Sequence, residues 1–176
     1  MKKLKNEELN RLSPEAFKNA KKNPLVLVLD DVRSAMNVGS AFRTSDAFSL
    51  EKIYLCGITA QPPHREINKT ALGAQDTVTW EHKETITHCI DQLKTDGYQI
   101  VAVEQADEST SLLDFEVKKD LKYAFVFGNE VFGVNDQVVE HADTVLEIPQ
   151  YGTKHSLNIS VSIGVVLWDF ISKLKP

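Results

Sequence analysis

Short apolar runs alternate along the chain with segments in which apolar residues recur at helical spacing. Six runs have the length and the β-branched or aromatic content of strands: 25–32, 52–58, 77–82, 98–104, 122–128 and 145–148. Helical spacing occurs in 38–48, 85–95, 136–142 and from 156 towards the C-terminus. This alternation predicts an α/β fold with a mostly parallel six-stranded sheet and flanking helices. Residues 59–75 and 111–117 are expected to be loops or irregular.

The first 22 residues differ from the remainder in charge. Residues 1–22 carry seven Lys or Arg against three Asp or Glu, whereas the following 154 residues carry 13 against 22. Ser13-Pro14 predicts a helix start, with Phe17 docking the helix on the body. We therefore expect a basic N-terminal helical extension (1–22) and one domain (23–176). The extension suits phosphate contacts, although a solvated surface helix has the same composition.

Composition narrows the class of protein. The chain has 176 residues, 42% of them hydrophobic, which suffices for one domain with its own core. It contains no apolar run of membrane-span length, and its N-terminus lacks the apolar centre of a signal peptide. The two cysteines are widely spaced in apolar contexts and are predicted to be buried thiols. We expect a cytoplasmic protein without a membrane segment.

Several nucleotide and metal chemistries do not fit the motifs. The glycines of Gly128 to Gly133 have P-loop separation, but Val134-Asn135 occupies the positions of the required Lys and Ser/Thr. No GxGxxG follows the first strand, which argues against a dinucleotide-binding fold. The five histidines are scattered, so no metal site is predicted.

Polar residues gather after the first, fifth and sixth predicted strands. In parallel sheets, ligands bind beyond the carboxyl ends of strands. These positions hold five candidate site residues: Asn37, Arg43, Glu130, Ser156 and Asn158. Each also has a structural reading, such as a helix cap for Asn37 or Asn158 and a solvated helix position for Arg43. Spacing alone leaves open whether they converge.

The same three segments carry ordered motifs. They are Asn37-Val38-Gly39-Ser40 with Arg43-Thr44, then Phe127-Gly128-Asn129-Glu130 closing at Gly133, and finally Ile148-Pro149, Gly152 and Ser156 to Val161. In order and spacing they resemble the motifs of the TrmH-type (SpoU) branch of the SPOUT RNA 2′-O-ribose methyltransferases. The resemblance covers about residues 24–172.

This resemblance implies a C-terminal deep trefoil knot, a homodimer and S-adenosylmethionine as methyl donor to a ribose 2′-hydroxyl of RNA. By position, Arg43, Asn37, Glu130, Ser156 and Asn158 match the family's catalytic residues. Cofactor contacts are expected at Val103, Gly128, Ile148 and Leu157. A guanidinium is not deprotonated at accessible pH, so we expect Arg43 to clamp the phosphate beside the target ribose.

The resemblance also bears on the substrate. Ribosomal-RNA members of the branch often carry an extra N-terminal RNA-binding domain, and only about 23 residues precede the first strand here. We therefore expect tRNA, with rRNA as the alternative. Two other classes stay open: a noncatalytic RNA-binding or assembly protein that retains the knotted fold, and a small-molecule α/β enzyme.

Overall fold

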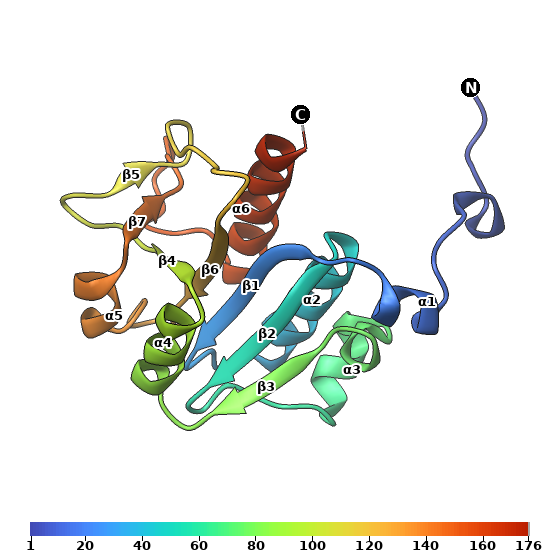
Figure 1. Cartoon of the computed structure of the whole chain (residues 1–176), viewed down its shortest axis with the longest axis horizontal. Helices are drawn as coiled ribbons and strands as arrows, with labels where there is room; N and C mark the ends of the chain where they lie inside the picture. Colours follow the sequence, from blue (N-terminus) through green and yellow to red (C-terminus); the bar gives the residue numbers. More distant parts are fainter. Residues whose placement is uncertain (176) are drawn as a thin grey trace.

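A computed structural model describes residues 1–175 and contains a seven-stranded parallel sheet flanked by helices (Figure 1). The strand order is β3-β2-β1-β6-β4-β7-β5. The strands are β1 (Asn23–Asp30), β2 (Leu50–Cys56), β3 (Trp80–Lys83), β4 (Tyr98–Val103), β5 (Thr110–Ser111), β6 (Lys122–Phe127) and β7 (Thr144–Glu147). The helices are α1 (Pro14–Asn19), α2 (Ala35–Ala47), α3 (Arg65–Ala71), α4 (Ile86–Thr95), α5 (Asp136–His141) and α6 (Ile159–Leu174), with 3-10 turns η1 (Asn6–Leu9) and η2 (Ala74–Asp76).

Both faces of the sheet are buried, and β1 shows why its sequence is continuously apolar. Alternate residues of a strand point to opposite faces. Leu25, Leu27 and Leu29 pack into the core cluster that contains α2, α3 and α6, whereas Val26 and Val28 join α4 and α5 on the other face. A strand without a polar face is the pattern of a parallel sheet covered on both sides. The predicted parallel α/β fold is thus confirmed.

The sheet has one strand more than the predicted six. The additional strand, β5, pairs only Thr110 and Ser111 with β7. Two residues at a sheet edge have no periodicity for a sequence pattern to reveal.

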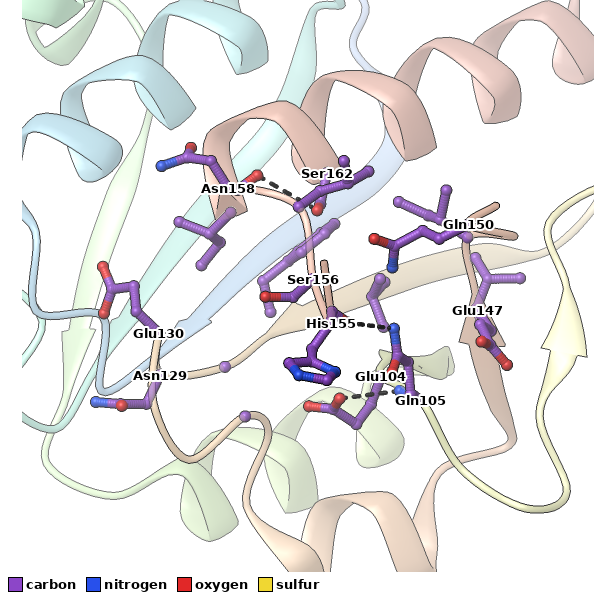
Figure 2. Close-up of a pocket in the computed structure, with 18 of the residues that line it drawn as sticks. Glu104, Gln105, Asn129, Glu130, Glu147, Gln150, His155, Ser156, Asn158 and Ser162 are labelled. Carbon is purple, nitrogen blue, oxygen red and sulfur yellow. Dashed lines mark hydrogen bonds between the residues drawn. The ribbon is translucent and has the colours of Figure 1, made fainter. Parts of the chain in front are cut away.

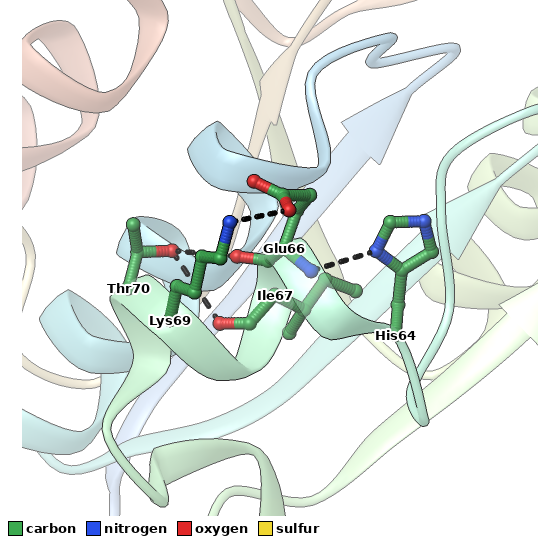
Figure 3. A network of polar contacts seen from close by, with 5 residues as sticks. All are labelled: His64, Glu66, Ile67, Lys69 and Thr70. Carbon is green, nitrogen blue, oxygen red and sulfur yellow. Dashed lines mark hydrogen bonds and ion pairs between the residues drawn. The ribbon is translucent and has the colours of Figure 1, made fainter.

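The stretch 59–75, predicted as a loop, contains a helix. Ile67 and Ala71 of α3 are buried against the core, and the backbone at Ile67 lies against Gly39 of α2. The Thr70 hydroxyl donates to the Met36 carbonyl (2.9 Å), which ties α3 to α2. Figure 3 shows the local polar contacts: His64 Nδ1 accepts from the Glu66 N–H (3.2 Å), and Lys69 pairs with Glu66. Tertiary packing therefore stabilises a helix in a segment where Pro62-Pro63 and the polar composition had predicted a loop.

The predicted helix start at Ser13-Pro14 and the predicted docking by Phe17 are both present in the N-terminal segment. Ser13 caps α1, because its Oγ accepts from the Ala16 N–H (3.2 Å), and Phe17 is buried. Before α1 the chain runs away from the sheet, and Leu4 and Leu12 are exposed (Figure 1).

Candidate active site

Loops at the carboxyl ends of β4, β6 and β7 enclose a cavity of about 460 Å³ (Figure 2). Because β4 lies between β6 and β7 in the sheet, the loops after β6 and β7 form opposite walls of the cavity. Its lining residues are Val103, Glu104, Gln105, Phe127, Gly128, Asn129, Glu130, Val131, Gly133, Leu146, Glu147, Ile148, Gln150, His155, Ser156, Leu157, Asn158, Ile159 and Ser162.

Hydrogen bonds connect three distant segments at one edge of this cavity. The Glu130 carboxylate accepts from the Arg33 and Ser34 N–H groups (2.9 and 3.0 Å) at the start of α2. It also accepts from Asn37 Nδ2 (3.1 Å), and Asn37 Oδ1 in turn accepts from Asn158 Nδ2 (3.4 Å). The loop after β6, the start of α2 and the start of α6 therefore share one polar network.

The Glu130 carboxylate is held in its ionised form. Partial desolvation raises the pKa of this carboxyl group, but the backbone N–H of Arg33, together with those of Glu130 and Ser34 and the Asn37 amide, lowers it below its ordinary value of 4.5. Its place at the N-terminus of α2 also suits a negative charge.

The loop after β6 has its shape set by Asn129 and two glycines. Asn129 and Gly133 exchange two backbone hydrogen bonds of 2.9 Å, and Asn129 Oδ1 accepts from the Val131 and Phe132 N–H groups. Gly133 has φ of 72°, which a residue with a Cβ rarely adopts. Gly128 lies against the backbone of Gly133, so a side chain at 128 would overlap the loop.

The loop after β7 leads directly into α6. That helix begins at Ile159, three residues later than the sequence pattern indicated, so Ser156 and Leu157 lie in the loop. Asn158 is the N-cap: its Oδ1 accepts from the Ser160 N–H (2.9 Å).

Eight of the nine predicted site residues fall at this cavity. Seven line it: Val103, Gly128, Glu130, Ile148, Ser156, Leu157 and Asn158. Asn37 joins them through its hydrogen bonds to Glu130 and Asn158. Arg43 does not line the cavity; it is exposed on α2. Sequence reasoning missed Glu104, Gln105 and Glu147. Glu104 and Glu147 fell inside the predicted strands 98–104 and 145–148, and the position of β4 between β6 and β7 was not known.

The cavity is electronegative. Three carboxylates line it, from Glu104, Glu130 and Glu147, and among the described lining residues none is Lys or Arg. A cavity with this charge favours a cationic ligand over a phosphorylated one. No group of three His, Cys, Asp or Glu side chains that could hold a metal ion occurs within residues 1–175. In the same part of the chain, no helix is long and apolar enough to cross a membrane.

Fold and site together define an α/β protein with a cavity of small-ligand size at the carboxyl edge of a parallel sheet. The chain belongs to the SpoU rRNA Methylase family, whose sequence profile matches residues 24–168.

Relatives with curated names are modifiers of both tRNA and rRNA. The chain is 29% identical to a tRNA (guanosine(18)-2′-O)-methyltransferase of Borreliella burgdorferi, covering 92% of this chain and 72% of the relative. It is also 29% identical to the 23S rRNA (guanosine-2′-O-)-methyltransferase RlmB of Neisseria meningitidis, covering 87% of this chain but 60% of the relative.

Solved structures agree with the fold. The A. aeolicus TrmH/SpoU tRNA modifying enzyme superposes with a TM-score of 0.79 at 27% identity, covering 89% of this chain and 78% of that one. The AdoMet-bound rRNA methyltransferase from Sinorhizobium meliloti gives a TM-score of 0.81 at 26% identity, covering 94% of this chain and 62% of that one.

Proposed function

We propose that this SpoU-family chain is an RNA methyltransferase that transfers a methyl group from S-adenosylmethionine to a ribose 2′-hydroxyl, with tRNA as substrate. The observation that carries the proposal is the cavity between the loops after β4, β6 and β7, together with the polar network of Glu130, Asn37 and Asn158 at its edge. The family's named relatives act on ribose 2′-oxygens of tRNA or rRNA.

The cavity fits S-adenosylmethionine in size and charge. Its volume of about 460 Å³ lies within the range of roughly 300–1,000 Å³ common for small-molecule sites. Apolar Leu146, Ile148 and Leu157 suit an adenine ring, and the carboxylates suit a cation. When bound, S-adenosylmethionine supplies a methyl group on a positively charged sulfur, and its transfer to a ribose 2′-oxygen releases the hydroxyl proton to solvent and leaves a neutral thioether.

Residue roles follow from placement. We assign cofactor contacts to Val103, Gly128, Ile148 and Leu157, all of which line the cavity. Glu130, Asn37, Ser156 and Asn158 orient the ribose at the open edge of the cavity. Fixed hydrogen-bonding groups accelerate transfer chiefly by holding the reacting atoms in line.

We propose that Arg43 contacts the RNA rather than the cofactor. Its exposed position on α2, outside the cavity, is compatible with a phosphate clamp beside the target ribose. A guanidinium binds phosphate through two parallel hydrogen bonds, which lysine cannot reproduce. Arg43→Lys is therefore expected to lower turnover at saturating RNA by about tenfold or more, the effect of removing one charge-assisted hydrogen bond. Near-full turnover of this variant would exclude the clamp.

The choice of tRNA over rRNA comes from the family resemblance, and charge supports binding of RNA of either kind. Residues 1–22 carry a net charge of +4 on a body of −9, so electrostatic attraction for RNA is concentrated in that segment, the proposed basic extension. Phe132 and Tyr151, 84% and 90% exposed, come from the two loops that wall the cavity and are free to stack on bases of the substrate.

We further propose a homodimer formed through α6, a deep trefoil knot involving the segments after β6 and β7, and a cytoplasmic location. The dimer is supported by an exposed apolar stripe on α6, formed by Val161, Val165 and Trp168. The knot rests on the family resemblance and on the position of β4 between β6 and β7. The location rests on the proposed RNA substrate.

Transfer of a tritiated methyl group from S-adenosylmethionine to unmodified total tRNA and, separately, to rRNA tests the proposal. Label on tRNA that disappears with Arg43→Ala is the expected result. Label on rRNA alone would retain the reaction and refute the substrate. Bound cofactor with no label on either RNA would favour a noncatalytic RNA-binding protein, and transfer to a small acceptor would favour a small-molecule enzyme.

A further inference from the structure

Two consecutive residues at the end of β4 touch both walls of the cavity. Glu104 and Gln105 follow the last residue of β4, which lies between β6 and β7. The Glu104 N–H donates to the Leu146 carbonyl of β7 (3.1 Å), so the backbone at this point belongs to the sheet and is fixed.

The Glu104 side chain turns towards the loop after β6. Its Oε2 accepts from the Val134 N–H (3.0 Å), and its Oε1 accepts from the Gln105 N–H (2.9 Å). The carboxylate occupies the space that a Cβ on Gly133 would need. Glycine at 133 therefore serves this contact as well as its positive φ.

The Gln105 side chain turns the opposite way, towards the loop after β7. Its Nε2 donates to the His155 carbonyl (2.9 Å), two residues before Leu157 (Figure 2). One dipeptide thus holds the loop that contains Glu130 and the loop that contains Ser156 and Leu157.

We propose that Glu104 and Gln105 form a brace that fixes the separation of the two walls, and so act as positioning residues for the methyl donor. The identity of the ligand rests on the function proposed above, whereas the brace rests on the hydrogen bonds. The brace holds the walls of the donor cavity, whereas the net positive charge that attracts RNA lies in residues 1–22. We therefore expect the brace to affect affinity for the donor more than affinity for RNA.

Nearly isosteric variants separate the brace from general stability. In Glu104→Gln, the new NH2 group faces one of two backbone N–H donors. In Gln105→Glu, the carboxylate cannot donate to the His155 carbonyl. Gln137→Glu is the matched control, because Gln137 is exposed on α5 and does not line the cavity. All three are compared with the unaltered protein by thermal unfolding, filter binding of tRNA, hydrogen exchange without ligand, and calorimetric titration with S-adenosylmethionine.

Faster exchange is expected in 129–134 for Glu104→Gln and in 150–157 for Gln105→Glu. Each variant should bind S-adenosylmethionine about threefold to tenfold more weakly, the effect of one hydrogen bond. The thermal midpoint should stay as in the control, and affinity for tRNA should fall by a smaller factor than affinity for S-adenosylmethionine. If the walls act as a unit, the double variant weakens binding by less than the product of the two single effects.

The two proposals fail in different ways. If hydrogen exchange in 129–134 and 150–157 is unchanged in both variants, the brace is refuted, whatever the ligand. Unchanged donor affinity despite faster exchange would overturn its positioning role. If the unaltered protein binds no S-adenosylmethionine, the proposed function fails, and loop exchange still decides whether the brace exists.

Discussion

At the scale of single residues, Asn158 combines a structural and a site contact in one amide. Its Oδ1 caps α6 by accepting from Ser160, and its Nδ2 donates to Asn37. Aspartate keeps the acceptor and removes the donor, whereas alanine removes both. We predict that Asn158→Asp unfolds at nearly the original temperature but is inactive, while Asn158→Ala is also destabilised by about 1 kcal/mol.

The control for this prediction is Asn135, the N-cap of α5, which accepts from Gln137 (3.0 Å). Asn135→Asp should retain both stability and methyl transfer. If Asn158→Asp also retains transfer, the amide donor has no role in the reaction, and the cap alone explains this residue.

Glu130 gives a second prediction, which concerns pH. Its pKa is lowered in the folded protein, so its contribution to the free energy of unfolding is present above 4.5 and is lost as pH falls through the folded value. The difference in unfolding free energy between the original protein and Glu130→Gln should be largest at neutral pH and shrink below pH 4.5.

Urea unfolding at a series of pH values measures this difference, with Glu140→Gln on the exposed face of α5 as control. A difference that stays constant from neutral pH to about pH 3 would show that the carboxylate contacts at Arg33 and Ser34 contribute nothing as a charge.

The sequence predicted most of the residues that lie at the cavity, but not all of the hydrogen bonds that connect its walls. Order and spacing of the three motifs were enough to place Asn37, Glu130 and Asn158 at strand ends, and the structure joins them. Glu104 and Gln105 could not be found in this way, because their importance depends on β4 lying between β6 and β7. That order is set by long-range pairing rather than by local pattern.

At the scale of elements, α6 is apolar on two sides. Ile163, Leu167 and Phe170 are buried in the core, whereas Val165 and Trp168 are exposed, the latter by 63%. The Trp168 ring lies 6.1 Å from that of Phe48, so the exposed stripe continues beside α2. A second copy of this chain would cover such a stripe.

We predict that Trp168→Asp converts a homodimer into a monomer, because a desolvated carboxylate at an interface is strongly unfavourable. Light scattering after size-exclusion chromatography measures the mass. Ile58→Asp is the control, since Ile58 is 69% exposed in the loop after β2. A monomeric original protein, or a dimer that survives Trp168→Asp, would contradict an interface on α6.

Elements with strong internal patterns were predicted well, and elements defined by their neighbours were not. The strand β1 has an uninterrupted apolar run, as expected for a strand that is buried on both faces of the sheet. By contrast, α3 is stabilised by packing of Ile67 and Ala71 on the core beside Gly39. The local sequence gives no indication of this packing. The predicted start of α6 was three residues too early, because the sequence offers several polar residues that could serve as N-cap. In the structure Asn158 is the N-cap.

At the scale of the whole molecule, charge is divided between a basic segment and an acidic body. Residues 1–22 lie beside the sheet at one end of the molecule (Figure 1) and supply a net charge of +4. The cavity is lined by three carboxylates. We predict that deletion of residues 1–22 weakens tRNA binding strongly and leaves binding of S-adenosylmethionine unchanged. The salt dependence should also decrease, by about 0.7–0.9 in the logarithmic slope for each phosphate that the shortened protein no longer neutralises.

Filter binding at several salt concentrations measures the affinity for RNA, and calorimetry measures the affinity for the cofactor. An equal decrease of both affinities would mean that the segment, through Phe17, only stabilises the fold.

Mass spectrometry of nucleosides from tRNA incubated with the protein and S-adenosylmethionine shows whether the cavity directs methyl transfer to a ribose 2′-oxygen. We predict one 2′-O-methylnucleoside, absent when Asn158→Asp replaces the original protein. A methyl group on a base, or a 2′-O-methylnucleoside that persists undiminished in Asn158→Asp, would contradict the assignment of this site.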